Sequence, residues 1–174
     1  MKHITLILFA MLFSLAAFAQ QSIDTDFTQT KLMKLSRKTT EKAGHITFDG
    51  VDKLTMNYTD PKGDYFKIEG NMVKINMDGK KAELDAEKAK MVKLQRSTLL
   101  NCLSGNWEQA AIDNDAETTI TEIDGYKNIL IQSKGKVPMG GYKSVELTYR
   151  LCYNVMTRMV LEEAIGIINT YVMK

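Results

Sequence analysis

Two neighbouring carboxylates, Glu162 and Glu163, are by type the residues of this chain best suited to acid–base chemistry. Paired carboxyl groups in a cleft can serve as proton donor and proton acceptor. A hydrated strand end explains the pair more simply, because the chain has no Gly-x-Ser-x-Gly motif and no histidine placed to activate a serine or cysteine. We therefore predict that the protein is not an enzyme.

Metal and phosphate sites are not predicted either. His45 lies on the polar side of an alternating segment, where we expect it to be exposed, and it lacks partners at zinc-ligand spacing. The acids Asp113, Asp115 and Glu117 lack the glycine and terminal glutamate of a calcium loop, so a solvated acidic turn is expected. GKVPMGGYKS, residues 135–144, departs from phosphate-loop spacing and predicts a loop. No cofactor is expected.

The two cysteines of the chain offer little redox chemistry. Cys102 falls on a predicted helix and Cys152 at a predicted strand turn, and neither belongs to a Cys-x-x-Cys pair. A single disulfide and two separate, mostly buried thiols are both compatible with the sequence.

The first residues of the chain predict export. Lys2 and His3 precede an apolar run, and Ala17-Phe18-Ala19 supplies a small-x-small cleavage site. We therefore expect residues 1–19 to be a signal peptide cleaved after Ala19. No cysteine follows that site to carry a lipid anchor, so a periplasmic protein is expected.

The remaining residues, 20–174, have the length of one domain and show no linker or repeat. The net charge of the whole chain is +2, and it falls by one when Lys2 leaves with the signal peptide. A nearly neutral chain argues against a dedicated nucleic-acid binder.

Alternation of apolar and polar residues predicts a mainly β protein. Its clearest runs carry Leu54, Met56 and Tyr58, then Val73, Ile75 and Met77. Later strands are expected at 119–123, 126–133, 142–151, 155–162 and 167–173. The segment 27–42 is compatible with a strand or a helix.

One helix is predicted between these groups of strands. Asp85 is a suitable N-cap and Gly105 a suitable end. Its apolar stripe contains Met91, Leu94, Thr98 and Cys102, with Leu99 and Leu103 beside it. About ten antiparallel strands with one helix predict an α+β, mainly β fold with a strongly curved sheet or a partial barrel.

Methionine is frequent in this predicted sheet. Residues 20–174 contain Met33, Met56, Met72, Met77, Met91, Met139, Met156, Met159 and Met173. Core filling explains each one singly, whereas a flexible thioether lining would also suit an apolar surface that adapts to its partner.

Several motifs, in order along the chain, resemble those of the periplasmic outer-membrane lipoprotein carriers, the LolA-like proteins of Gram-negative bacteria. They are Phe27-Thr28-Gln29, the strand that Gly44 opens, Asp52-Lys53-Leu54 with Tyr58 and Pro61, Glu69-Gly70-Asn71 with Val73 and Ile75, and the closing MVLEEAIGIINTYVM with Glu163 and Gly166. Each motif alone is weak, and their order and spacing make the resemblance specific.

The resemblance implies a half-open antiparallel β-barrel with a helical lid over an apolar cavity. It implies a periplasmic carrier that shelters the acyl chains of lipoproteins and delivers them towards the outer membrane. The implied partners are acylated lipoproteins or other lipid-bearing cargo, inner-membrane release machinery and an outer-membrane acceptor. We expect a monomer that binds no nucleic acid.

One departure from the family concerns the lid. Better-known members carry an arginine just before the Pro-Asn/Asp segment that helps keep the lid shut, whereas this chain has Asp49-Gly50 there. Lid control by that residue is therefore not carried over.

The predicted lipid-binding residues come from the early strands, the helix and the later strands. They are Leu54, Met56, Tyr58, Phe66, Val73, Ile75, Met91, Leu94, Leu147, Met159 and Leu161. A solid core position is the alternative for each. A carrier of another amphiphile, such as a free lipid or a lipid-linked small molecule, and a cofactor-free enzyme on the same fold are the alternative functions.

Overall fold

A computed structural model describes residues 22–174, which form an eleven-stranded antiparallel sheet and two helices. The predicted signal peptide, residues 1–19, lies outside the described residues. In chain order the elements are β1 (Ile23–Met33), β2 (Lys38–Phe48), β3 (Lys53–Asp60), β4 (Tyr65–Glu69), β5 (Met72–Met77), β6 (Lys80–Asp85), α2 (Lys90–Leu103), α3 (Trp107–Asp113), β7 (Ala116–Ile123), β8 (Tyr126–Ser133), β9 (Tyr142–Arg150), β10 (Val155–Glu163) and β11 (Ile167–Met173).

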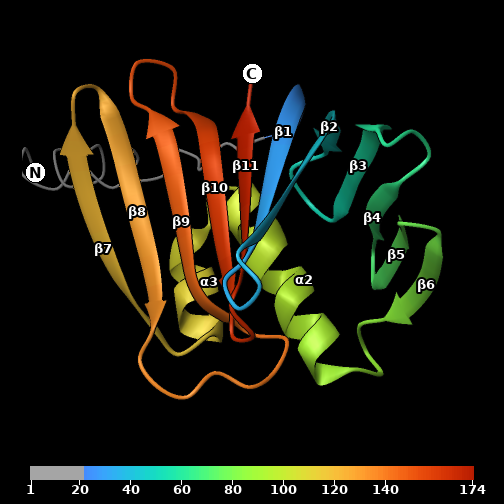
Figure 1. Cartoon of the computed structure of the whole chain (residues 1–174). Helices are drawn as coiled ribbons and strands as arrows, with labels where there is room; N and C mark the ends of the chain where they lie inside the picture. Colours follow the sequence, from blue (N-terminus) through green and yellow to red (C-terminus); the bar gives the residue numbers. More distant parts are fainter. Residues whose placement is uncertain (1–21) are drawn as a thin grey trace, which may run out of the picture.

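The sheet has the order β6-β5-β4-β3-β2-β1-β11-β10-β9-β8-β7. The first and last strands, β1 and β11, therefore pair at its centre, while β6 and β7 are its unpaired edges. Figure 1 shows the sheet curving round α2 and α3, with β6 and β7 at opposite sides. The predicted mainly β, half-open antiparallel barrel with a helical lid is confirmed.

Alternation of the side chains explains why these segments form strands. On β3, Leu54, Met56 and Tyr58 are buried, whereas the residues between and beyond them are more exposed. The ambiguous segment 27–42 contains no helix: it belongs to β1 and β2, which pair from Ile23 opposite Phe48 to Met33 opposite Lys38, with a turn at 34–37 between them.

The predicted start of the helix is wrong. Asp85 ends β6, which pairs with β5 and places Leu84 opposite Val73. The Asp85 side chain accepts a hydrogen bond from the Glu87 N–H at 3.0 Å, in a turn before α2 begins at Lys90. The charged residues before the helix are compatible with a helix or with an exposed strand. They form the strand β6 because they pair with β5.

The helices cover the concave face of the sheet. Leu99, Leu100 and Leu103 of α2 join the same hydrophobic core as buried residues of the strands. The predicted helix end is confirmed, since α2 stops at Leu103 and Gly105 follows with φ +80°. The short helix α3 was not predicted, and it buries Ala110 and Ala111.

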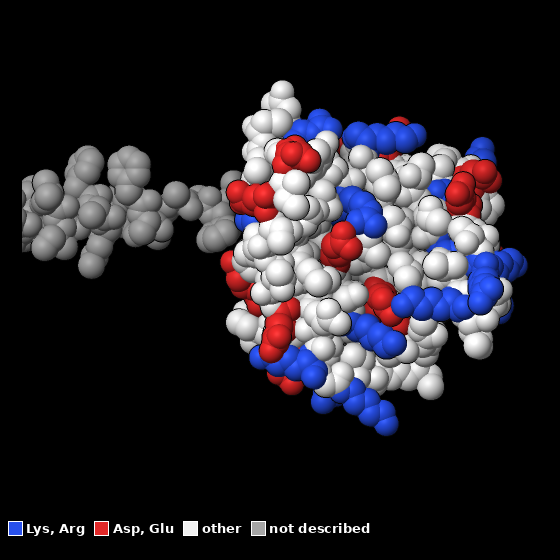
Figure 2. Space-filling view, turned by 60° about the vertical axis from the view of Figure 1, so that its left-hand side comes forward, with Lys and Arg blue, Asp and Glu red and all other residues white. Residues whose placement is uncertain are grey.

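The face seen in Figure 2 carries charges of both signs, and Lys and Arg side chains stand beside Asp and Glu side chains over much of it. Within residues 22–174, no helix has the length and apolar character needed to span a membrane.

Candidate functional site

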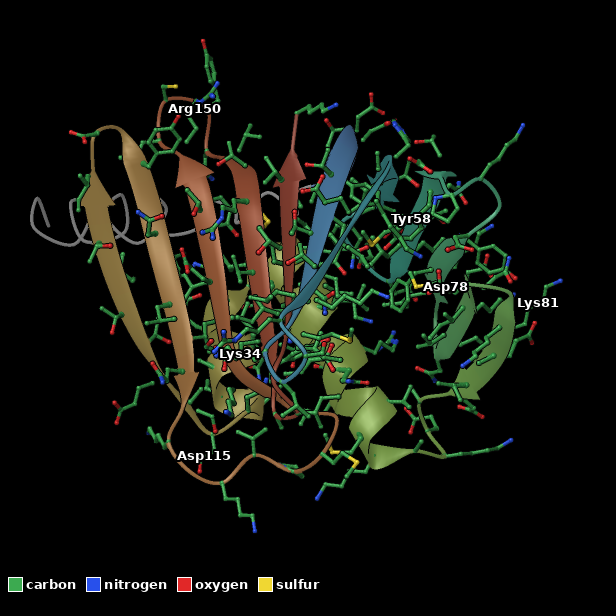
Figure 3. The ribbon with its side chains drawn as sticks, viewed as in Figure 1. Lys34, Tyr58, Asp78, Lys81, Asp115 and Arg150 are labelled. Atoms are coloured by element: carbon green, nitrogen blue, oxygen red, sulfur yellow. The ribbon has the colours of Figure 1, made fainter. Side chains whose placement is uncertain are left out.

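A cavity of about 470 Å³ lies between the concave face of the sheet and α2. Sites for small molecules in proteins commonly have volumes of about 300–1,000 Å³. The residues that line it are Gln29, Lys31, Met33, Lys38, Thr40, Lys42, Ile46, Met56, Tyr58, Phe66, Met77, Asp78, Leu99, Leu103, Tyr142, Met159, Leu161, Glu163, Asn169 and Tyr171. In Figure 3, Tyr58 and Asp78 lie on the side of the molecule formed by β3–β6.

The apolar part of the lining comes from both halves of the sheet and from the helix. Met56 and Phe66 are Cα partners on β3 and β4, while Met159 and Leu161 stand on β10. Leu99 and Leu103 of α2 complete this part from the opposite side. Together these side chains can exclude water from a hydrocarbon chain.

Polar residues form a continuous band across β2, β1 and β11. Gln29 is paired in register with both Lys42 and Tyr171, and Lys31 with both Thr40 and Asn169. The band ends at β10, where Met159 and Leu161 are the register partners of Tyr171 and Asn169. We call the lining residues Gln29, Lys31, Lys38, Thr40, Lys42, Asn169 and Tyr171 the polar seam.

A hydrogen-bonded chain runs through the seam. The Tyr58 hydroxyl donates to Gln29 Oε1 at 2.8 Å, and Gln29 Nε2 donates to Asn169 Oδ1 at 3.0 Å and to the Tyr171 hydroxyl at 3.2 Å. Asn169 Nδ2 donates to Glu163 Oε1 at 3.0 Å. Among residues 22–174, no buried side-chain nitrogen or oxygen lacks a partner. The polar groups are therefore fixed in place as well as satisfied.

Glu163 is part of this cavity, and the interpretation of the pair Glu162-Glu163 as a hydrated strand end holds only for Glu162. Glu162 forms an ion pair with Lys34 at 2.7 Å. Glu163 is half-buried, and desolvation raises the pKa of its carboxyl group, while Lys31 and the hydrogen bond from Asn169 act in the opposite direction. The strand alternation turns Glu163 inwards.

Lys42 is the paired cation of the seam. Its Nζ donates to Asp64 Oδ2 at 2.8 Å and to Asp78 Oδ1 at 2.9 Å, and it lies 5.6 Å from the centre of the Tyr58 ring. Burial lowers the pKa of Lys42, but the hydrogen bonds to the two aspartates outweigh it and raise that pKa. Lys42 therefore ties β2 to the connections that follow β3 and β5, beside the cavity wall.

Of the eleven predicted lipid-binding residues, the structure brings five to the cavity wall: Met56, Tyr58, Phe66, Met159 and Leu161. The other six do not line it. Leu54, Val73 and Leu147 are buried in the core, Ile75 packs against that core, and Met91 and Leu94 are half-buried on α2.

None of the residues of the polar seam was predicted as a site residue from the sequence. The available signal was the alternation of Phe27, Gln29, Lys31 and Met33 on β1, which places two polar residues on the same face as a buried phenylalanine. Inward polar residues on an otherwise apolar face indicate polar partners or a cavity there, because burying a polar group without a partner costs free energy.

The other residues with potential chemistry have local structural roles. His45 is partly exposed and lies 2.8 Å from Asp24 and 2.9 Å from Asp26. Asp113 accepts hydrogen bonds from Ser97 and Gln109. Among the described residues, no group of three or more His, Cys, Asp or Glu is placed to hold a metal ion. Residues 135–141 form a loop before β9.

Both cysteines are free thiols. Cys102 is buried on α2, as its place in the apolar stripe predicts, whereas Cys152 is exposed in the turn after β9. Of the two alternatives, the structure has the separate thiols, but Cys152 is exposed rather than buried because it lies in the turn between β9 and β10.

Asp49-Gly50 forms the turn between β2 and β3. Asp49 Oδ1 accepts hydrogen bonds from the N–H groups of Val51, Asp52 and Lys53 at 2.8, 3.1 and 3.0 Å. Gly50 has φ +87°, a conformation that side chains with a Cβ rarely adopt. This pair therefore shapes a turn.

Comparison with protein-family models and with curated proteins finds no match. Solved structures do match over most of the chain. A LolA superfamily protein from Nitrosomonas europaea is 11% identical, with 90% of this chain and 85% of that chain covered and a TM-score of 0.40.

A DUF1329 family protein from Desulfovibrio piger is also 11% identical, with 90% of this chain and 85% of that chain covered and a TM-score of 0.40. Lipoprotein LppX from Mycobacterium tuberculosis is 11% identical, with 87% and 85% covered and a TM-score of 0.30. A LolA superfamily protein is thus among the solved structures that this chain resembles.

Proposed function

We propose that this protein is a carrier that shelters the acyl chains of lipoproteins between its curved sheet and α2. The observation that carries the proposal is the 470 Å³ cavity, with an apolar wall that combines β3, β4, β10 and α2. The motif order in the sequence supports the same function. Sheltering an acyl chain requires no covalent chemistry, so the protein needs neither a nucleophile nor a cofactor.

The binding energy comes from removing methylene groups from water. Each buried methylene contributes about 0.8 kcal/mol, so even a partly enclosed acyl chain gains several kcal/mol. Met56 and Met159 stand on opposite sides of the polar seam, on β3 and β10. Their unbranched thioethers can adjust as chains enter and leave, which suits a carrier that must also release its cargo.

Direct contact with the acyl chain is proposed for the five predicted residues at the wall and for Leu99 and Leu103, which sequence reasoning did not assign. The remaining predicted residues are not proposed to touch the acyl chain. Among them, Leu54 and Leu147 are fully buried and support the cavity wall from the core. Substitutions at these two positions are expected to act through stability.

The proposed route is periplasmic. The signal peptide exports the chain, inner-membrane machinery loads a lipoprotein, and an outer-membrane acceptor receives it from the monomeric carrier. Asp49-Gly50 replaces the lid arginine of related carriers, so opening and closing must depend on other contacts, such as those of α2 with the sheet.

A carrier of another amphiphile is the second candidate, and the polar seam favours it. A purely apolar cavity would suit hydrocarbon alone, whereas Gln29, Asn169 and Tyr171 offer hydrogen-bonding groups inside the same cavity. Such groups fit a cargo with a polar part that enters the protein.

Mass spectrometry of material extracted from the protein purified from its native envelope, without detergent, tests the proposal. Triacylated peptide supports the lipoprotein carrier, and plain lipid supports the second candidate. Recovery of neither would contradict both. Met56→Phe should reduce the recovered amount by filling the cavity, whereas Met72→Phe, on β5 away from the cavity, is the matched control.

A further inference from the structure

Two lysines of the β1–β2 hairpin line the cavity, Lys31, which is half-buried, and Lys38, which is exposed. Both line the cavity, yet neither ammonium group forms a hydrogen bond or an ion pair with another of the residues 22–174. Lys42, in the same seam, is by contrast held by Asp64 and Asp78. The cavity wall therefore carries two ammonium groups that form no hydrogen bond or ion pair with another described residue, although Glu163 acts on Lys31 electrostatically.

The two lysines lie on the same face of the β1–β2 hairpin. Lys31 is opposite Thr40, and Lys38 is opposite Met33, so Lys31 and Lys38 are diagonal neighbours. Diagonal neighbours on antiparallel strands are separated by about 7–8 Å, a span that two long side chains can close round one group. The hairpin can thus present both ammonium groups to a single ligand.

Polarity changes along these two strands. On the inward face, Ile46 of β2 lines the cavity and is fully buried, whereas Lys31 and Lys38 lie nearer the β1–β2 turn. An elongated ligand along the hairpin would therefore have hydrocarbon surroundings at one end and positive charge at the other.

We infer that the cavity is built for an amphiphile with an anionic head group, a carboxylate or a phosphate, held by Lys31 and Lys38. Its acyl chain lies against Met56, Leu103 and Met159. This inference rests on the proposed function, because it specifies which acyl-bearing molecule the same cavity takes. Charge-assisted hydrogen bonds from ammonium groups to an anion are stronger than those between neutral groups, so they would select the head group.

The negative charge of Glu163 should oppose the binding of an anionic head group. Its carboxyl group lines the same cavity and interacts electrostatically with Lys31. A bound anion must therefore compete with Glu163 for Lys31. Removing the Glu163 charge should strengthen binding of an anionic amphiphile, while removing the lysine charges should weaken it.

The experiment measures displacement of a fluorescent acyl probe from the purified protein by four competitors of equal chain length. They are a fatty acid, its methyl ester, the lysophosphatidate with that acyl chain and the alkylammonium ion. The fatty acid or the lysophosphatidate should bind about tenfold more tightly than the ester, as expected for a charge-assisted contact. The stronger of these two identifies the head group as carboxylate or phosphate.

Substitutions of the charged residues test whether Lys31 and Lys38 hold the anionic head group. The double variant Lys31→Gln, Lys38→Gln should lose the preference for the anion and keep the affinity for the ester within about twofold, and Glu163→Gln should increase the preference. Lys34→Gln is the control, since Lys34 belongs to the turn after β1, pairs with Glu162 and does not line the cavity.

Equal binding of acid, lysophosphatidate and ester by the unaltered protein would overturn the inference without any variant, and so would a preference for the alkylammonium ion. A preference that survives in a folded double variant would also overturn it. Failure of every competitor and of the probe to bind would instead contradict the proposed function, so the two failures are distinguishable.

Discussion

The hydroxyl group of Tyr58 on β3 donates a hydrogen bond to Gln29 Oε1 on β1, 2.8 Å away, across the intervening strand β2. Both side chains are buried, and desolvation raises the pKa of Tyr58 far above its usual value, so the hydroxyl remains a donor. This contact joins the apolar wall on β3 to the polar seam.

Tyr58→Phe should therefore destabilise the protein. The substitution leaves Gln29 Oε1 without its donor in a buried position, which costs about 1–3 kcal/mol of unfolding free energy. Chemical denaturation followed by circular dichroism measures this change. Tyr153→Phe, at an exposed position, should alter stability little, and an equal loss in both variants would argue against the network.

Gly44→Ala should also destabilise, for a steric reason. A Cβ at Gly44 would collide with the Asn57 carbonyl oxygen and approach the Phe27 ring to 2.9 Å. Since Phe27 is buried and packs edge-on against Tyr58 with ring centres 5.3 Å apart, the ring has little room to move. Overpacking of this kind costs about 1–3 kcal/mol, measurable by thermal or chemical denaturation.

Gly135→Ala is the matched control for this substitution, because nothing lies within 4 Å of a Cβ at that loop position. Stability unchanged in Gly44→Ala would mean that β2 and β3 are not as closely paired as described.

His45 should titrate above its usual range. Hydrogen bonds to Asp26 and Asp24 raise the pKa of the imidazole from 6.5. A raised folded-state pKa contributes stability that is fully present below the unfolded pKa and is lost as the pH rises through the folded pKa. Nuclear magnetic resonance titration of the ring protons measures this pKa directly. Asp24→Asn with Asp26→Asn should lower it, and an unchanged titration would contradict the pairing.

The two thiols should differ sharply in reactivity. Burial raises the pKa of the Cys102 thiol to about 12, whereas Cys152 is exposed. Because the thiolate is the reactive form, a maleimide reagent should label one site in the native protein and both after denaturation. Cys152→Ser should abolish native labelling, and mass spectrometry counts the labels. Labelling of Cys102 in the native protein would show that α2 lifts from the sheet.

The sequence predicted strands best where inward residues are apolar. Leu54, Met56 and Tyr58 alternate cleanly because β3 faces the core along its length. The segment 27–42 remained ambiguous for a physical reason, since its inward residues Gln29 and Lys31 face a cavity and need not be apolar. Six of the twenty lining residues belong to this segment, so the pattern was least clear where part of the site lies.

The extent of the cavity was beyond sequence patterns. Leu147 and Met159 are register partners with inward side chains, yet only Met159 lines the cavity. Alternation tells which face a residue occupies, whereas the position of α2 over that face determines which inward residues border open space. The helix start, which the sequence placed at Asp85, likewise depended on a tertiary pairing of β6 with β5.

Equilibrium binding of a fluorescent acyl probe to the purified protein tests most directly whether the apolar wall of the cavity accepts an acyl chain. Saturable one-to-one binding is expected, and Leu161→Phe should weaken it about tenfold by excluding one or two methylenes at about 0.8 kcal/mol each. Leu84→Phe, on the edge strand β6, should bind like the unaltered protein. Absence of saturable binding, or equal binding by a folded Leu161→Phe variant, would contradict the claim.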